Sequence, residues 1–173
     1  MVEEWGFDSH DEALSVLNGF FDIDVGSELN RIQSHLLWFG TFLLDIGGIT
    51  PFLYCFDDRE EILAILDRVT GSRLTYSYGR FGGVTRDIDD LFIEQTRGFI
   101  KRLRSRAPMY DRLVHGNVIF RKRCEGVGVI SRDVAREYAV TGPTLRASGV
   151  AYDVRRAEPY GGYEQFDFEV PVG

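Results

Sequence analysis

The sequence predicts a mainly α-helical domain with a small amount of β structure (α+β). Two long segments between residues 28 and 71 carry apolar residues at helical spacing, and only a short turn separates them. Near the C-terminus, a short segment alternates apolar and acidic residues, which is the period of a strand. The chain of 173 residues, with 44% apolar and 13% aromatic side chains, is large enough for one hydrophobic core. Residues 1–27 carry a weaker pattern, so we treat 28–173 as the domain.

The first strong helical signal starts at Glu28. Apolar residues follow at intervals of three and four, which places them on one face of a helix: Leu29, Ile32, Leu36, Phe39, Leu43 and Ile46. The opposite face is also apolar from Leu36 onward, so we expect this helix to be buried on most sides. Ser27 is the expected N-cap and Gly47–Gly48 the stop. Upstream, residues 11–21 predict only a short helix, followed by a break at Gly26.

A second helix is predicted from Pro51 to Gly71. Thr50 is its expected N-cap, and a proline at the first helical position loses nothing because its N–H would be unpaired there anyway. Two apolar helices joined by so short a turn form an antiparallel hairpin, the unit of a helical bundle. The predicted core is therefore a helical bundle.

The rest of the chain carries weaker signals. Residues 71–86 predict a loop, and a third helix is expected from Asp87 to Arg106, with acidic residues at its start and basic residues at its end. Pro108 is expected to follow a break after that helix. The remaining predicted elements are two short helices and one half-buried strand: 109–115, 132–139 and 166–170.

Composition excludes several classes of function. The net charge of −7 and the pI near 5.0 argue against a nucleic-acid partner, because phosphate binding needs clustered positive charge. Cys55 and Cys124 lie far apart and outside any CxxC pattern, so alone they make neither a zinc nor an iron–sulfur site. No run of about 18 apolar residues is present, and the acidic first residues do not resemble a signal peptide. We therefore expect membrane attachment only through partners.

Asp45 is the first candidate for chemistry. It lies between Leu44 and Ile46, near the end of a helix that is apolar on nearly all sides. A carboxylate in such surroundings loses solvation, which favours its protonated form and suits it to proton transfer. The alternative is a structural aspartate bonded to Thr50 or to a nearby backbone N–H.

Three further polar groups have both a structural and a functional interpretation. Glu28, Arg31 and His35 share a helix face, where an intra-helix ion pair is favoured over an ionisable chain pointing to an interior. Arg80 and Arg86 flank two glycines in a spacing that matches no phosphate-binding motif, so a tight turn is favoured over a phosphate cradle. For residues 141–173 we expect a buried or interfacial loop ordered by ion pairs among three residues: Arg146, Asp153 and Arg155.

Six distinctive segments follow one another along the chain: ELNRIQSHLLWFGTFLLDIGGITPFLY (28–54), DREEILAILDRVTGSRL (58–74), GRFGGVTRDI (79–88), GVGVISRDVA (126–135), TGPTLRASGVAYDVRRAEPYGGY (141–163) and FDFEVPVG (166–173). In order and spacing they resemble the D-subunit family of the NADH:quinone oxidoreductases (complex I). The resemblance covers about residues 28–173 without a large gap, whereas residues 1–27 do not resemble the family.

The resemblance implies a fold related to the large subunit of nickel–iron hydrogenases, without the nickel site. It implies a peripheral-arm subunit that forms the quinone-reduction chamber with a small subunit, which holds the terminal [4Fe–4S] cluster; this chain alone binds no cofactor. Asp45 matches a family aspartate implicated in proton transfer near the quinone, and Arg80 matches an arginine of the loop near the cluster. Many members have a histidine soon after the GxR element, where the matching stretch of this chain, residues 74–77, has none. With Thr75 at that position, we expect weaker proton coupling at the cluster.

The implied partners are quinone and the other complex I subunits, including the membrane arm, at the cytoplasmic side of the cell membrane. NADH is expected on a different subunit, because no dinucleotide fingerprint is present. The family residues that bind the quinone headgroup, a histidine and a tyrosine, precede the segment that starts at Glu28 and have no match here. We therefore expect a truncated fragment that is inactive in isolation.

Two other interpretations stay open. One is a fragment of the large subunit of a membrane-bound hydrogenase-like or coenzyme F420-linked dehydrogenase complex. The other is a non-catalytic helical interaction module, in which Asp45 is only a satisfied polar residue.

Overall fold

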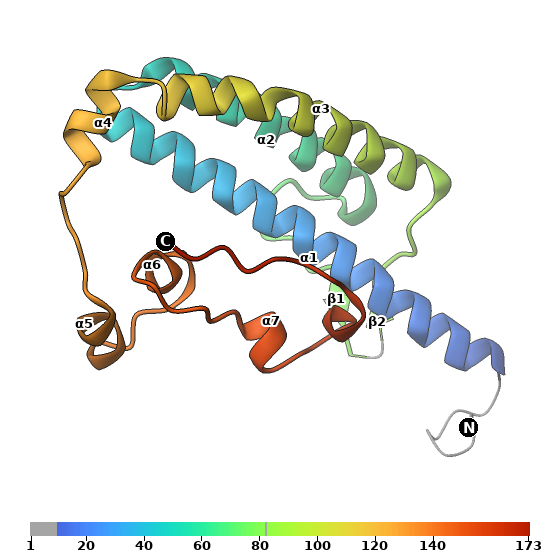
Figure 1. Cartoon of the computed structure of the whole chain (residues 1–173). Helices are drawn as coiled ribbons and strands as arrows, with labels where there is room; N and C mark the ends of the chain where they lie inside the picture. Colours follow the sequence, from blue (N-terminus) through green and yellow to red (C-terminus); the bar gives the residue numbers. More distant parts are fainter. Residues whose placement is uncertain (1–9, 82) are drawn as a thin grey trace. The chain divides into compact units, whose positions relative to one another are not determined.

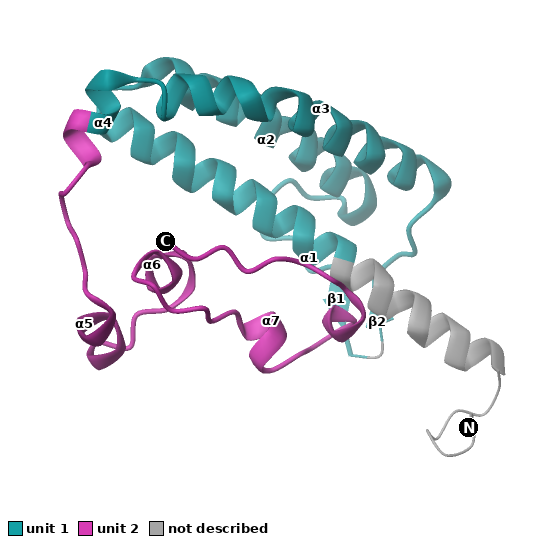
Figure 2. Cartoon of the chain, viewed as in Figure 1, with its two compact units in different colours: residues 1–121 teal, residues 122–173 magenta. Residues whose placement is uncertain are grey.

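The computed structural model describes residues 10–81 and 83–173, with side chains from Val25 onward. It confirms the predicted mainly α fold with little β structure (Figure 1). The chain divides into two compact units, residues 1–121 and 122–173 (Figure 2). No helix in the described ranges combines the length and the apolar character that crossing a bilayer requires.

Helix α1 (His10–Asp45) is a single helix of 36 residues. The predicted break at Gly26 and the predicted cap at Ser27 are therefore wrong, and residues 11–21 belong to the same helix, although their side chains lie outside the described part. A helical glycine costs only about 1 kcal/mol relative to alanine, which packing can offset. Gly26 is buried beside the ring of Tyr78, so tertiary contact supplies that packing.

Helix α2 (Ile49–Thr70) follows α1 after the predicted glycine turn. The helix begins at Ile49, with Gly48 at the cap position, so the predicted N-cap at Thr50 is wrong. Pro51 still lies within the first turn, where backbone N–H groups have no helical partner. Gly71 ends the helix as predicted, in a left-handed conformation with its N–H donated to Asp67 O at 2.7 Å.

Helix α3 (Asp90–Val114) differs most from prediction. Asp89 caps it by accepting a bond from the Phe92 N–H at 2.8 Å, so the helix starts three residues after Asp87. Pro108 lies inside the helix, and the segment predicted as a separate helix at 109–115 continues it. Pro108 and Arg104 are both exposed, so the carbonyl that loses its hydrogen bond at the proline has access to water.

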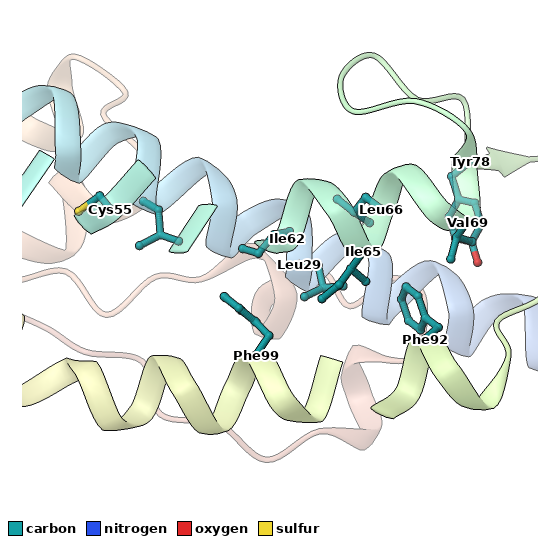
Figure 3. Packing of buried hydrophobic residues seen from close by; sticks show 10 residues of the cluster. Leu29, Cys55, Ile62, Ile65, Leu66, Val69, Tyr78, Phe92 and Phe99 are labelled. Carbon is teal, nitrogen blue, oxygen red and sulfur yellow. The ribbon is translucent and has the colours of Figure 1, made fainter. Parts of the chain in front are cut away.

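The core of unit 1 lies between these three helices. Leu29 of α1 meets Ile62 and Leu66 of α2, while α3 contributes Phe92 and Phe99 (Figure 3). The predicted apolar stripe of α1 supplies its part of this cluster, with Leu29, Leu36 and Leu43 all less than 9% exposed. The expected helical hairpin is confirmed, with a third helix packed on it.

A small antiparallel hairpin lies in the predicted loop region. Strands β1 (Gly79–Arg80) and β2 (Gly83–Val84) pair through Gly79 with Val84 and Arg80 with Gly83. The favoured tight turn is therefore confirmed. β2 contacts α1, which fixes the hairpin to unit 1.

Unit 2 consists of short helices and connecting segments. Helix α4 (Val118–Cys124) spans the boundary between the units, and α5 (Arg132–Glu137) confirms the predicted helix at 132–139. Three short elements were not predicted: α6 (Gly142–Ala147), α7 (Val154–Ala157) and the 3-10 turn η2 (Tyr163–Gln165). The predicted strand at 166–170 is wrong, because this stretch pairs with no other strand in the described chain.

Candidate functional site

Asp45 is the last residue of α1, immediately before the turn into α2. Its side chain is exposed, so the burial expected from the sequence is not supplied by this chain. In the part of the chain that the structure describes, no hydrogen bond joins Asp45 to Thr50, one of the two structural partners considered for it. The Asp45 carboxylate is therefore solvent-exposed at the turn between α1 and α2.

Exposed apolar side chains flank this turn on three helices. We call them the apolar collar: Leu37, Trp38, Phe42, Leu44, Ile49, Leu53, Val118 and Ile119. Trp38 stacks on Phe42 at 6.1 Å, and Phe42 meets the ring of Phe120 at 6.4 Å, so α1 and α4 contact each other here. Trp38 is 57% exposed and Ile49 is 61% exposed. The second apolar face of α1, predicted to be buried, is thus open in the chain alone and available to another chain.

A buried ionic cluster between α2 and α3 was not predicted. Asp58 of α2 is fully buried, and its two carboxylate oxygens receive different donors. Oδ1 accepts a bond from Arg106 Nη1 at 2.6 Å, and Oδ2 accepts the Tyr110 hydroxyl at 2.6 Å. The Nε of Arg102 also lies 3.3 Å from Oδ1, without hydrogen-bond geometry. The charge of Asp58 is therefore compensated inside the protein.

The outer side of this cluster is partly exposed. Asp57 accepts bonds from Arg102 at 2.7 Å and from Arg106 at 2.9 Å, and Glu61 pairs with Arg102. The donors follow one another at intervals of four on α3, so they share one face. In the sequence, donors spaced four residues apart in one helix and the acidic residues of the other helix were the signal from which this cluster could have been predicted.

The thiol of Cys55 lies beside the same cluster. It is fully buried, whereas Cys124 is only partly buried. Burial raises the pKa of Cys55 to about 11, with a contribution from the Asp58 charge, against the lowering effect of the hydrogen bond with Tyr110. Burial also raises the pKa of Tyr110, and its bond to Asp58 acts in the same direction. Both groups therefore carry their protons at neutral pH, and Tyr110 is a hydrogen-bond donor.

The loop that holds Thr75 and Arg80 lies along a different part of α1. Both side chains are exposed, and Arg80 lines an open hollow with Gly79 and Phe81. The Tyr76 hydroxyl donates to Asn30 Oδ1 at 2.7 Å, which anchors this loop on α1. Asn30 lies fifteen residues before Asp45, or about 22 Å along a helix axis. The structure therefore does not bring Asp45 together with the loop candidates.

Thr75 has an unusual backbone conformation. Its φ is +52°, in the left-handed region that a β-branched residue rarely adopts. The hydroxyl donates to the Leu74 carbonyl at 2.8 Å. A strained residue held in place by its surroundings is a recurrent feature of functional loops.

Two structural expectations about ion pairs are confirmed. Arg31 Nε donates to Glu28 Oε1 at 2.9 Å, which is the intra-helix pair favoured from the sequence. In unit 2, Asp153 pairs with Arg155 at 2.9 Å and lies 3.8 Å from Arg146. These cations lower the pKa of Asp153 to about 2, mainly through the hydrogen bond with Arg155.

Comparison with known proteins identifies the family of this chain. The family of the respiratory-chain NADH dehydrogenase 49 kDa subunit matches residues 45–173. The chain belongs to this family. Relatives named as the D subunit of NADH-quinone oxidoreductase include one from Syntrophobacter fumaroxidans, 67% identical over 147 residues that make up 85% of this chain and 39% of the relative. Another, the D 2 subunit of Opitutus terrae, is 56% identical over 86% of this chain and 37% of its own length.

The chain also resembles a solved structure. It matches a chain of the membrane-bound sulfane sulfur reductase, an archaeal respiratory membrane complex, with a TM-score of 0.84 and 36% identity. That match covers 90% of this chain and 42% of the other. The chain thus spans about two fifths of the length of the proteins that it matches. The range matched by the family includes Asp45, Thr75, Arg80 and the buried Asp58 cluster.

Proposed function

We propose that this chain forms part of the chamber in which an NADH:quinone oxidoreductase reduces quinone, with Asp45 as a proton-transfer residue. The observation that carries the proposal is an exposed carboxylate at the turn between α1 and α2, where the family match begins, flanked by the apolar collar. Apolar side chains of this number, left open on the chain alone, fit a surface that another chain covers in the complex.

Covering the collar gives Asp45 the surroundings that proton transfer needs. Exclusion of water favours the protonated carboxyl and slows the loss of its proton to solvent. Reduction of a quinone to a quinol takes up two electrons and two protons. The electrons would come from the [4Fe–4S] cluster of the partner small subunit, and Asp45 would deliver a proton to an oxygen of the reduced quinone or to a group beside it.

The loop of Thr75 and Arg80 would face the partner's cluster. Arg80 is an exposed cation within the tight hairpin, and a positive charge near a cluster favours the reduced form of the cluster. The distance along α1 between this loop and Asp45 fits a division of labour, with electron entry at one place and proton delivery at another.

The remaining partners follow from the same proposal. The chain would sit in the peripheral arm at the cytoplasmic side of the cell membrane, attached through the membrane arm and the other complex I subunits. NADH would bind on another subunit, and the isolated chain would not reduce quinone. Quinone reduction by the purified chain would contradict this part of the proposal.

The test of Asp45 uses the complete complex. Asp45→Asn keeps the size of the side chain and removes the proton that it exchanges, so quinone reduction and proton translocation should fall about 100-fold, within the range for a positioned acid–base group. Asp133→Asn, at an exposed aspartate of α5, serves as the matched control and should leave both rates unchanged. Unchanged rates in Asp45→Asn would favour the helical interaction module instead.

A respiratory complex with another electron acceptor is the second candidate. The 36% identity with a chain of the sulfane sulfur reductase favours it. Assays of the purified complex with a quinone analogue and with a sulfane sulfur compound as acceptors separate the two candidates.

A further inference from the structure

Tyr110 lies where the three long helices of unit 1 meet. On α3, it is followed by a buried Val114, and its hydroxyl donates to the buried Asp58 of α2 at 2.6 Å. Its ring meets the ring of Phe39 on α1 edge-on, with 6.2 Å between centroids. One side chain therefore contacts both members of the helix pair that carries Asp45.

Next to this contact, α1 and α2 approach each other closely. Gly40 is buried, and a Cβ atom on it would lie 3.1 Å from the Cβ of Cys55. The Cys55 thiol in turn lies against Tyr110. Phe39, Gly40, Cys55, Asp58 and Tyr110 thus form one contact region, which we call the Tyr110 node.

The node is close to Asp45 along both helices. Phe39 precedes Asp45 by six residues, or about 9 Å along the axis of α1. Cys55 follows the start of α2 at Ile49 by the same number of residues. The turn between α1 and α2 is tightly packed. The Gly48 N–H donates to Leu43 O at 2.6 Å, and a Cβ atom on Gly48 would lie 3.1 Å from that oxygen. A shift of one helix against the other therefore moves Asp45.

We propose that Tyr110 is a positioning residue for Asp45: its hydroxyl bond to Asp58 and its ring contact with Phe39 hold the end of α1 and the start of α2 in the arrangement that proton transfer requires. This inference rests on the proposed function of Asp45. The role suits a tyrosine, because a buried aspartate needs a donor and the aromatic ring fills the space toward α1. The raised pKa of Tyr110, caused by burial, keeps the donor protonated at neutral pH.

Arg106 does not replace Tyr110 in this role. It binds the other oxygen of Asp58, and it is also engaged with Asp57 and with the ring of Tyr54. Loss of the tyrosine hydroxyl therefore removes the donor to Asp58 Oδ2, while Arg106 still compensates the charge of Asp58 through Oδ1. We expect a small displacement rather than unfolding.

The experiment is a double-mutant cycle in the purified complete complex, with a soluble quinone analogue as acceptor. Tyr110→Phe keeps the ring and removes the hydroxyl. We expect it to lower kcat about tenfold with an unchanged KM, since a small misplacement of an acid–base group reduces the rate steeply. In the Asp45→Asn background, the same substitution should change kcat less than about twofold, because the group that it positions is already absent. Tyr138→Phe, at an exposed tyrosine of unit 2, is the control and should have no effect.

The cycle separates this inference from the proposed function. An equal loss of kcat in both backgrounds would show that Tyr110 supports the fold in general and would overturn the positioning role, even with Asp45 essential. Full activity of the Asp45→Asn single variant would refute the proposed role of Asp45, and it would also refute the positioning role of Tyr110. If Tyr110→Phe prevents assembly, Phe39→Leu takes its place, because it removes the α1 side of the contact and leaves the bond between Tyr110 and Asp58 intact.

Discussion

At the scale of single residues, the buried charge of Asp58 contrasts with the exposed charge of Asp45. We expected a buried Asp45 from its apolar neighbours in sequence, whereas Asp58 lies in a charged run and was not singled out. Helical periodicity assigns a residue to a face, but it does not say which face another helix covers. The face of Asp45 is open in this chain, whereas α3 covers that of Asp58.

We expect Asp58→Ala to destabilise the chain strongly. Removing the carboxylate leaves Arg106 and Arg102 near each other without their shared buried partner, and breaking a buried ion pair costs about 3–5 kcal/mol. Because both arginines are partly exposed, we expect the lower end, about 3 kcal/mol. Urea unfolding followed by circular dichroism measures this change.

Glu60→Ala is the matched control for Asp58→Ala. Glu60 of the same helix pairs with Arg73 at 2.6 Å on the surface, where solvent screening leaves such a pair with little effect on stability. Equal losses of stability in the two variants would contradict the assignment of Asp58 as the ionic centre of unit 1.

Thr75 permits a direct test of proton coupling at the partner's cluster. In the complete complex, we expect the midpoint potential to depend weakly on pH, because threonine does not ionise. Thr75→His should steepen the dependence toward about 59 mV per pH unit, the limit for one proton per electron. Redox titrations at several pH values measure the slope. A slope at that limit with Thr75 in place would refute the expectation.

At the scale of helices and loops, apolar periodicity correctly predicted the helices that bury an apolar stripe. The predictions failed where a glycine or a proline indicated a helix break that the structure does not have. The α1–α2 hairpin and the end of α2 at Gly71 were predictable because the helical spacing of apolar residues stops where the glycines occur. Gly26 and Pro108 indicated breaks, yet α1 and α3 continue through them, since contacts distant in sequence hold both helices. The alternation at 166–170 indicated a strand, but a strand also needs a pairing partner.

An ion pair between Asp153 and Arg155 stabilises the irregular segment of unit 2, so the stability of this segment should depend on pH. Asp153 has a pKa of about 2 when folded, below the 3.8 of an ordinary aspartate. Its ionised form thus stabilises the fold above about pH 4, and this contribution is lost as the pH falls from about 4 to about 2.

The ring of Phe168 reports on this acid transition. Arg155 lies 4.1 Å from its centroid and also binds Asp153, so release of the arginine should move the ring resonances in NMR spectra. Asp153→Asn should remove the step between about pH 4 and pH 2. Persistence of the step in that variant would assign it to another group.

At the scale of the whole molecule, the apolar collar is an exposed surface that the proposed assembly would cover. The chain spans about two fifths of the length of its relatives, and the collar places eight exposed apolar side chains on α1, α2 and α4. Which chain covers them is not encoded in periodicity or composition. For this reason the resemblance of sequence motifs, and not the pattern of single residues, indicated the quinone chamber.

We expect the isolated chain to self-associate through the collar. Leu53→Lys with Ile119→Lys places two charges on it and should shift the chain toward the monomer in light scattering after gel filtration. Val129→Lys, at an exposed valine outside the collar, is the control. The double variant should also weaken assembly of the complete complex. A wild-type chain that is already monomeric would contradict the expectation.

Under the proposed function, Asp45 exchanges a proton as quinone is reduced. Infrared difference spectroscopy of the complete complex, recorded between the oxidised and quinone-reduced states, observes this exchange at the carboxyl group itself. We predict a carboxylic C=O band that changes on reduction and is absent from Asp45→Asn, with the Asp133→Asn spectrum unchanged. A band that persists in Asp45→Asn would show that another carboxyl group exchanges the proton, and it would contradict the proposed role of Asp45.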